Sequence, residues 1–235
     1  MHSAAQRLYV ALDVPSAHAA EPIVKQLAGE VGGFKVGAEL FYSDGAGIAD
    51  LIVGLGANLF LDLKLHDIPR TVEAGAKRLA KQGAQLITVH ASGGTDVVRA
   101  AVEGASVNPH TRVLAVTVLT SHSQETLREI GVTRAMQDQV MALAELAARA
   151  GAHGLVCSAL EVAALRALLG PDVTLLCPGI RPEGADAGDQ KRVATPAEAL
   201  RSGADLLVVG RPILEASDRR AAAAAIVADM VRALG

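Results

Sequence analysis

Short apolar runs rich in β-branched residues recur along the whole chain, and helix-length segments separate them. These segments are rich in Ala, Leu, Glu, Lys and Arg, with apolar residues at helical spacing. Strands that alternate with helices predict right-handed βαβ crossovers and a parallel sheet. The eight candidate strands cover residues 8–13, 34–37, 59–64, 86–90, 113–119, 154–158, 173–178 and 206–210.

Eight strand–helix units in 235 residues predict a compact (β/α)₈ TIM barrel. A doubly wound open sheet is the alternative α/β architecture. It would usually place a glycine-rich turn after the first strand, where this chain continues Leu12-Asp13-Val14-Pro15. The sequence has no linker, low-complexity stretch or change of composition, so we expect residues 1–235 to form a single barrel domain with catalytic function.

Composition argues against several classes of function. The 22 basic and 25 acidic residues give a net charge of −3 and are scattered, with no basic stripe for a nucleic acid. No apolar stretch is long enough to span a membrane, and the N-terminus lacks the pattern of a signal peptide. Cys157 and Cys177 lie in apolar runs without paired neighbours, which favours core positions over zinc ligands. We therefore expect a cytoplasmic protein that binds neither nucleic acid nor membrane.

One candidate strand carries charges that a barrel interior would not normally tolerate. In Leu61-Asp62-Leu63-Lys64-Leu65, alternation places Asp62 and Lys64 on one face and the leucines on the other. A structural ion pair, or a strand end in solvent, would also explain this pair alone. Lys35 ends the preceding strand and should neighbour Asp62, and this much charge exceeds what core stability requires.

Polar residues also stand at the ends of most other candidate strands. The C-terminal ends of barrel strands meet at one mouth, where TIM-barrel active sites lie. The polar residues at these ends are Asp13, Lys35, Asp62, Lys64, His90, Thr120, Ser158, Arg181 and Arg211.

The segment D-L-K-L-H-D-I-P at residues 62–69 resembles the D-x-K-x-x-D signature of orotidine 5′-monophosphate decarboxylases of the bacterial type. That signature alone is also found in related sugar-phosphate decarboxylases and synthases. Further elements of the family occur in order along nearly the whole chain, and the complete set is specific. They are A-L-D at 11–13, K-V-G at 35–37, L-T-S at 119–121, P-G-I-R-P at 178–182, Gln190 and G-R-P-I at 210–213.

The resemblance implies cofactor-independent decarboxylation of orotidine 5′-monophosphate to UMP, the last step of de novo pyrimidine nucleotide synthesis. Lys64 would stabilise and protonate the carbanion left on the pyrimidine ring. Asp62 would lie near the substrate carboxylate and, with Lys35 and Asp67, would hold Lys64 charged and aimed.

The resemblance also assigns substrate contacts and a partner. It implies a homodimer with shared active sites, in which Asp67, Ile68 and Thr71 reach the partner's site. A loop at residues 182–189, whose composition suggests mobility, would close on the phosphate. The remaining contacts would be made to ribose by Asp13 and Lys35, to pyrimidine by Thr120, and to or beside the phosphate by Arg181, Gln190, Gly210 and Arg211.

Two alternatives remain open from the sequence. One is a magnesium-dependent sugar-phosphate decarboxylase or aldolase of the same barrel group, although those enzymes carry a glutamate where this chain has Lys35. The other is a non-catalytic nucleotide-binding barrel. His66 and His90 could suggest a metal site, but structural roles are expected for both, and no metal is predicted. Arg70 departs from the asparagine that the family commonly has, which leaves its side chain without an assigned role.

Overall fold

The chain forms a closed barrel of eight parallel strands, in which β1 pairs with both β2 and β8. We describe a computed structural model, which places residues 3–183 and 192–234. Closure confirms the expected (β/α)₈ fold and excludes the open sheet. The strands are β1 (Leu8–Ala11), β2 (Gly33–Val36), β3 (Leu59–Leu65), β4 (Ala84–His90), β5 (Arg112–Val116), β6 (Gly154–Val156), β7 (Thr174–Cys177) and β8 (Leu206–Val209).

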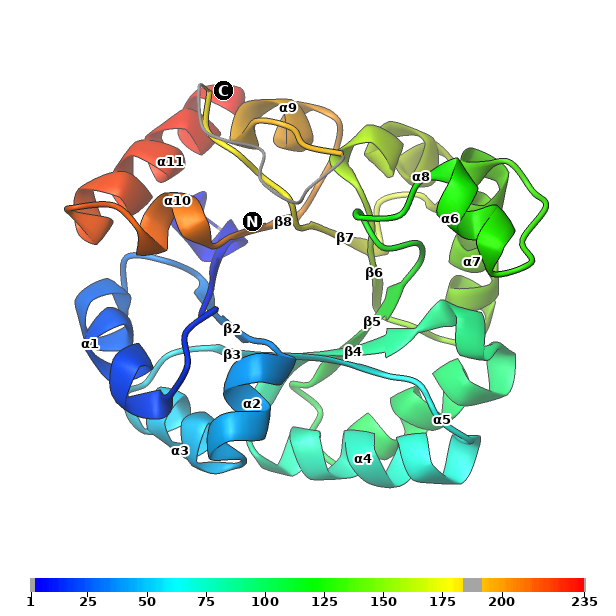
Figure 1. The fold of residues 1–235 in the computed structure, drawn as a ribbon, viewed down its shortest axis with the longest axis horizontal. Helices are drawn as coiled ribbons and strands as arrows, with labels where there is room; N and C mark the ends of the chain where they lie inside the picture. The colour runs from blue at the N-terminus through cyan, green and yellow to red at the C-terminus, as the bar shows by residue number, and fades with distance from the viewer. Residues whose placement is uncertain (1–2, 184–191, 235) are drawn as a thin grey trace.

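Helices surround the barrel as an outer ring, and the strands enclose its centre (Figure 1). Short helices α2, α6 and α10 are additions to the loops that follow β2, β5 and β8. The helices are α1 (Ala17–Leu27), α2 (Ala38–Asp44), α3 (Gly47–Gly54), α4 (Pro69–Lys81), α5 (Thr95–Ala105), α6 (Gln124–Glu129), α7 (Met136–Arg149), α8 (Val162–Leu169), α9 (Pro196–Arg201), α10 (Arg211–Leu214) and α11 (Arg219–Leu234). Three 3₁₀ turns accompany them: η1 (Ala5–Arg7), η2 (Ala91–Gly93) and η3 (Ala159–Glu161).

Several strands end earlier than their apolar runs predict. The runs to Asp13 and Leu119, for example, leave the hydrogen-bonded ladder at Ala11 and Val116. Leu12 and Val118 stay buried beyond those ends. The apolar pattern therefore follows burial, which continues into the loops at the mouth after strand pairing has stopped.

Two apolar layers stabilise the barrel. Inward-facing side chains, among them Phe60, Leu114 and Leu176, fill the centre, and a larger layer lies between strands and helices. Cys157 and Cys177 are free and buried in the outer layer, as expected. A hydrogen bond with Cys177, together with burial, raises the pKa of the Cys157 thiol, which disfavours a reactive thiolate at Cys157.

Helix α4, which follows the segment after β3, packs closely against α5. Val72, Ala76, Leu79 and Ala80 form its buried stripe at helical spacing. A side chain at Gly104 of α5 would collide with the backbone of α4, so only glycine permits the observed approach. In the part of the chain that the structure describes, no helix is long and apolar enough to cross a membrane.

Candidate active site

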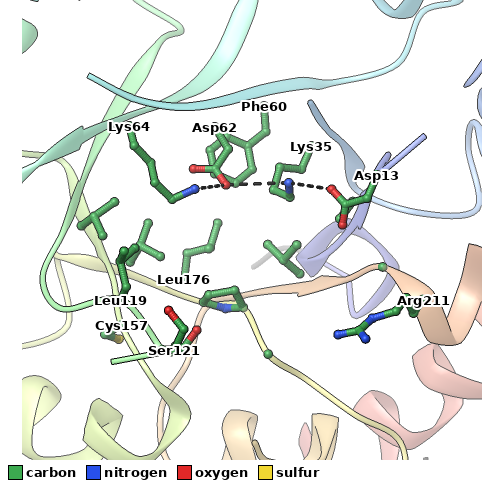
Figure 2. A pocket seen from close by; sticks show the side chains of 18 of the residues that line it. Asp13, Lys35, Phe60, Asp62, Lys64, Leu119, Ser121, Cys157, Leu176 and Arg211 are labelled. Atoms are coloured by element: carbon green, nitrogen blue, oxygen red, sulfur yellow. Dashed lines mark hydrogen bonds and ion pairs between the residues drawn. The ribbon is translucent and has the colours of Figure 1, made fainter. Parts of the chain in front are cut away.

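Four charged side chains form a continuous row at the mouth of the barrel, in the order Lys64, Asp62, Lys35 and Asp13 (Figure 2). Lys64 Nζ lies 2.8 Å from Asp62 Oδ2. Lys35 Nζ lies 3.8 Å from the same Asp62 oxygen and 3.3 Å from Asp13 Oδ1. Because the signs alternate, each charge has an opposite neighbour that offsets its desolvation. The expected proximity of Lys35 to Asp62 is confirmed.

The Asp62 carboxyl is nearly buried and remains ionised. Burial is the largest influence on it and disfavours the charged form. The charges on Lys35 and Lys64, with hydrogen bonds from Lys64 and Thr88, outweigh burial and lower the pKa of Asp62 below its ordinary value. At neutral pH this carboxylate can therefore hold the Lys64 ammonium in place.

A bulge in β3 brings Asp62 and Lys64 together. Leu61 pairs with Ile87 and Leu65 with Val89, so residues 62–64 of β3 lie opposite the single residue 88 of β4. Lys64 has a φ of 48°, which makes it the one non-glycine residue with positive φ among residues 3–183 and 192–234. Such a backbone is sparsely populated by lysine, and bulges commonly re-aim side chains beside active sites. Asp62 and Lys64 share a face of β3, as expected from the alternation of side chains along a strand. The bulge also affects where the two side chains lie, and the sequence did not predict it.

A cavity of about 600 Å³ opens beside the charged row. This volume lies in the range of small-ligand sites. Phe60 and Leu176 belong to the apolar core that fills the barrel centre and also line the cavity. Lys64 and Leu119 lie toward one end of the view in Figure 2, and Asp13 and Arg211 toward the other. The site can thus hold an elongated ligand with an apolar face and two different polar ends.

Most of the site residues expected from the sequence meet at this cavity. They come from β1, β2, β3, β5, β7 and β8 or from the loops that follow these strands. The expected residues that line the cavity are Asp13, Lys35, Asp62, Lys64, Thr120, Arg181, Gly210 and Arg211.

Three expected residues do not line the cavity of their own chain. Asp67, Ile68 and Thr71 are exposed where β3 leads into α4, and Ile68 is 65% exposed. Asp67 Oδ1 accepts a hydrogen bond from the Ile68 N–H at 2.6 Å. Gln190 and most of the expected lid fall at residues 184–191, outside the described part of the chain.

His66 and His90 lie against each other beside the charged row. The rings of His66 and His90 lie 5.2 Å apart between centroids at 46°. Burial first, and then the charges of His66 and Lys64, lower the pKa of His90. Among the described residues, no three or more His, Cys, Asp or Glu side chains are grouped to hold a metal ion.

Comparison with known proteins decides the family. The sequence model described as "Orotidine 5'-phosphate decarboxylase / HUMPS family" matches residues 6–226. The chain belongs to this family. The orotidine 5′-phosphate decarboxylase of Anaeromyxobacter sp. strain K is 53% identical over 225 residues, which are 96% of this chain and 98% of that protein. The enzyme of the same name from Paramagnetospirillum magneticum is 50% identical over 230 residues, 95% of this chain and 97% of that one.

Solved structures agree with this assignment. The crystal structure of orotidine 5′-phosphate decarboxylase from Lactobacillus acidophilus superposes with a TM-score of 0.85 at 41% sequence identity. The match covers 95% of this chain and 98% of that chain. The family resemblance inferred from the ordered set of motifs is therefore confirmed over almost the full length.

One feature of this family member escaped sequence reasoning. The Arg192 guanidinium forms a buried ion pair with Glu161 and donates to the carbonyl oxygen of Leu119 at 3.1 Å. It thereby ties the chain after residue 191 to the loop that carries Thr120. The sequence shows only an arginine in Q-K-R-V, and nothing in its spacing predicts a partner in η3 or after β5.

Proposed function

We propose that this chain decarboxylates orotidine 5′-monophosphate to UMP without a cofactor and so completes pyrimidine nucleotide synthesis. The observation that carries the proposal is the Lys64–Asp62–Lys35–Asp13 row along a nucleotide-sized cavity. The names of relatives that share about half of its residues identify the same reaction.

Lys64 is assigned to the chemical step. The bond between the ring carbon and the carboxylate breaks, CO₂ leaves, and the electron pair stays in the plane of the pyrimidine ring. The Lys64 ammonium stabilises this pair and transfers a proton to the carbon, and the neutral amine regains a proton from solvent. Asp62, held ionised, keeps the ammonium charged and directed into the cavity.

The polarity of the cavity supports one orientation for the substrate. The pyrimidine would lie near Lys64, Leu119 and Thr120, and the ribose beside Asp13 and Lys35. The phosphate would bind at Gly210 and Arg211, after β8, where TIM barrels often bind phosphate. A side chain at Gly210 would approach Ala11 Cβ and Asp13 Oδ2 to 3.3 Å, so glycine keeps the backbone accessible there.

A homodimer with shared sites would explain why Asp67, Ile68 and Thr71 do not line the cavity of their own chain. These residues stand at the barrel mouth and are exposed in one chain. A second cavity of about 340 Å³ adjoins the charged row and leaves room beside Lys64. We infer that the partner's segment completes this side of the site, with Asp67 as a second carboxylate near the ammonium.

A magnesium-dependent relative of the same family is the principal alternative. Lys35 argues against it, because its ammonium stands between the Asp13 and Asp62 carboxylates, where a divalent cation would be repelled. The test is an assay of orotidine 5′-monophosphate decarboxylation by the purified protein before and after exhaustive EDTA treatment. We expect the same turnover before and after the treatment. Activity that disappears with EDTA and returns with magnesium would favour the alternative.

The same assay separates an enzyme from a nucleotide-binding scaffold. UMP binding without turnover of orotidine 5′-monophosphate would indicate a scaffold. A pure binder would gain nothing from two ammonium groups crowded around one buried carboxylate. We further infer that residues 1–235 act as one catalytic domain and work in the cytoplasm.

Arg211→Ala should raise the KM for orotidine 5′-monophosphate about 100-fold, because a charge-assisted phosphate contact is lost. Steady-state kinetics on the nucleotide and on phosphate-free orotidine measure the effect. The exposed Arg128 of α6 provides the control, and Arg128→Ala should leave kcat and KM unchanged for both the nucleotide and the nucleoside. Equal losses on the nucleotide and on the nucleoside would contradict the phosphate assignment.

A further inference from the structure

Thr88 lies at the centre of the distortion that aims Lys64. It stands in β4 opposite the bulge of β3, and its side chain is completely buried. A buried hydroxyl requires hydrogen-bond partners, and the partners of Thr88 both belong to the charged row.

The hydroxyl makes two bonds with different directions. Thr88 Oγ1 accepts the Lys64 backbone N–H at 2.8 Å and donates to Asp62 Oδ1 at 3.0 Å. The second oxygen of Asp62 accepts the Lys64 ammonium at 2.8 Å. One hydroxyl thus fixes both the backbone of the proposed proton donor and the carboxylate that orients its side chain.

The bulge makes this role necessary. Regular parallel pairing would give the Lys64 N–H a backbone acceptor, but the register shift removes Lys64 from the ladder. The left-handed backbone at Lys64 is unfavourable for lysine and persists only where its surroundings enforce it. The Thr88 hydroxyl supplies one such constraint and satisfies a donor that the bulge would otherwise leave unpaired.

We propose that Thr88 is a positioning residue for decarboxylation: its hydroxyl sets the place of the Lys64 ammonium by holding the Lys64 backbone and Asp62 together. Thr88 is absent from the cavity lining, so it acts through these two residues and not on the substrate. The inference rests on the proposed function, since it concerns the geometry of the same proton donor.

Thr88→Val keeps the shape of the side chain and removes the hydroxyl. We expect kcat to fall about 10- to 100-fold with less than about a 3-fold change in KM, because displacement of a reacting group affects the chemical step most. Thr88→Ser, which keeps the hydroxyl, should restore kcat to within about 3-fold of the unaltered protein. The measurement is steady-state decarboxylation of orotidine 5′-monophosphate by the full chain.

The pH profile provides a readout that a purely structural role would not move. A hydrogen bond donated to a carboxylate favours its charged form, so removal of the Thr88 donor should raise the pKa of Asp62. The acidic limb of kcat in Thr88→Val should therefore move to higher pH. Thr88→Ser should keep the limb of the unaltered protein.

A matched control is available at the other end of the barrel. Thr111 lies just before β5 and Ala84 begins β4, so both stand at the opposite ends of their strands from the charged row. The Thr111 hydroxyl is also buried and donates to the carbonyl oxygen of Ala84 at 2.6 Å. Thr111→Val should lose stability without a change in kcat or in the acidic limb. If Thr88→Val does not fold, Thr88→Cys carries the test, with at least about a 10-fold loss of kcat expected from its weak hydrogen bonding.

Each contrary outcome is distinct. Unchanged kcat and pH profile in Thr88→Val, or in Thr88→Cys if Thr88→Val does not fold, would overturn the proposal. Equal defects in Thr88→Ser and Thr88→Val, or an equal kcat loss in Thr111→Val, would also overturn it. Failure of the unaltered protein to decarboxylate the nucleotide would instead refute the proposed function itself.

Discussion

Lys64→Ala is expected to lower kcat for orotidine 5′-monophosphate by at least about 10⁴-fold, because the change removes the proposed proton donor and with it the positive charge proposed to stabilise the ring carbanion. The Lys64 ammonium lies at the cavity, 2.8 Å from an ionised Asp62. In the proposed binding orientation, alanine would leave that carboxylate facing the substrate carboxylate without a lysine between them. Decarboxylation assays sensitive to slow turnover measure the loss. Lys64 is partly exposed, so the fold should survive, which circular dichroism checks.

The control for this change is another lysine of the same region. Lys77 is exposed on α4 and does not line the cavity, so Lys77→Ala should retain full activity. Turnover by Lys64→Ala within about 10-fold of the unaltered protein would refute the role assigned to the ammonium, since a general acid contributes at least that much.

If the proposed shared-site dimer forms, mixing the inactive Asp67→Ala and Lys64→Ala proteins is expected to restore about a quarter of the unaltered activity. Random exchange makes half of the dimers mixed, and a shared-site heterodimer has one intact site of two. That site takes Lys64 from one chain and Asp67 from the other. Activity is followed after subunit exchange has been verified by native mass spectrometry.

A second mixture tests whether recovery depends on sharing. Lys35 and Lys64 line the same cavity of one chain, so every site in a heterodimer of Lys35→Ala and Lys64→Ala carries one defect. This pair should recover nothing. Absence of recovery in the Asp67→Ala mixture, despite proven exchange, would count against the shared site.

The sequence was sufficient to predict the barrel and most of its mouth. Eight apolar runs marked the strands because burial imposes the same pattern on each βαβ unit. Residues as distant in the sequence as Asp13 and Arg211 could be placed together, since the C-terminal ends of all barrel strands meet at one end. The contact between Lys35 and Asp62 was predicted, but the distances between the charges and the contact of Asp13 with Lys35 were not.

Features that depend on tertiary packing could not be predicted. The bulge at residues 62–64 and the left-handed Lys64 arise from contacts with β4, and neither leaves a mark in the period of β3. Thr88 stands within an ordinary strand pattern, so its two bonds to the charged row are invisible without coordinates. The Arg192–Glu161 ion pair joins residues 31 positions apart, and it too could be found only from the coordinates.

A crystal structure of the protein with a 6-substituted UMP analogue would show whether Lys64 faces the reacting carbon of the pyrimidine. We expect Lys64 Nζ within about 3 Å of the substituent on that carbon, which is hydrogen-bonding distance for a proton donor. We also expect the phosphate at Gly210 and Arg211. A nucleotide bound with its base at the Arg211 end, or a Lys64 ammonium directed away from the ring, would refute the role proposed for Lys64.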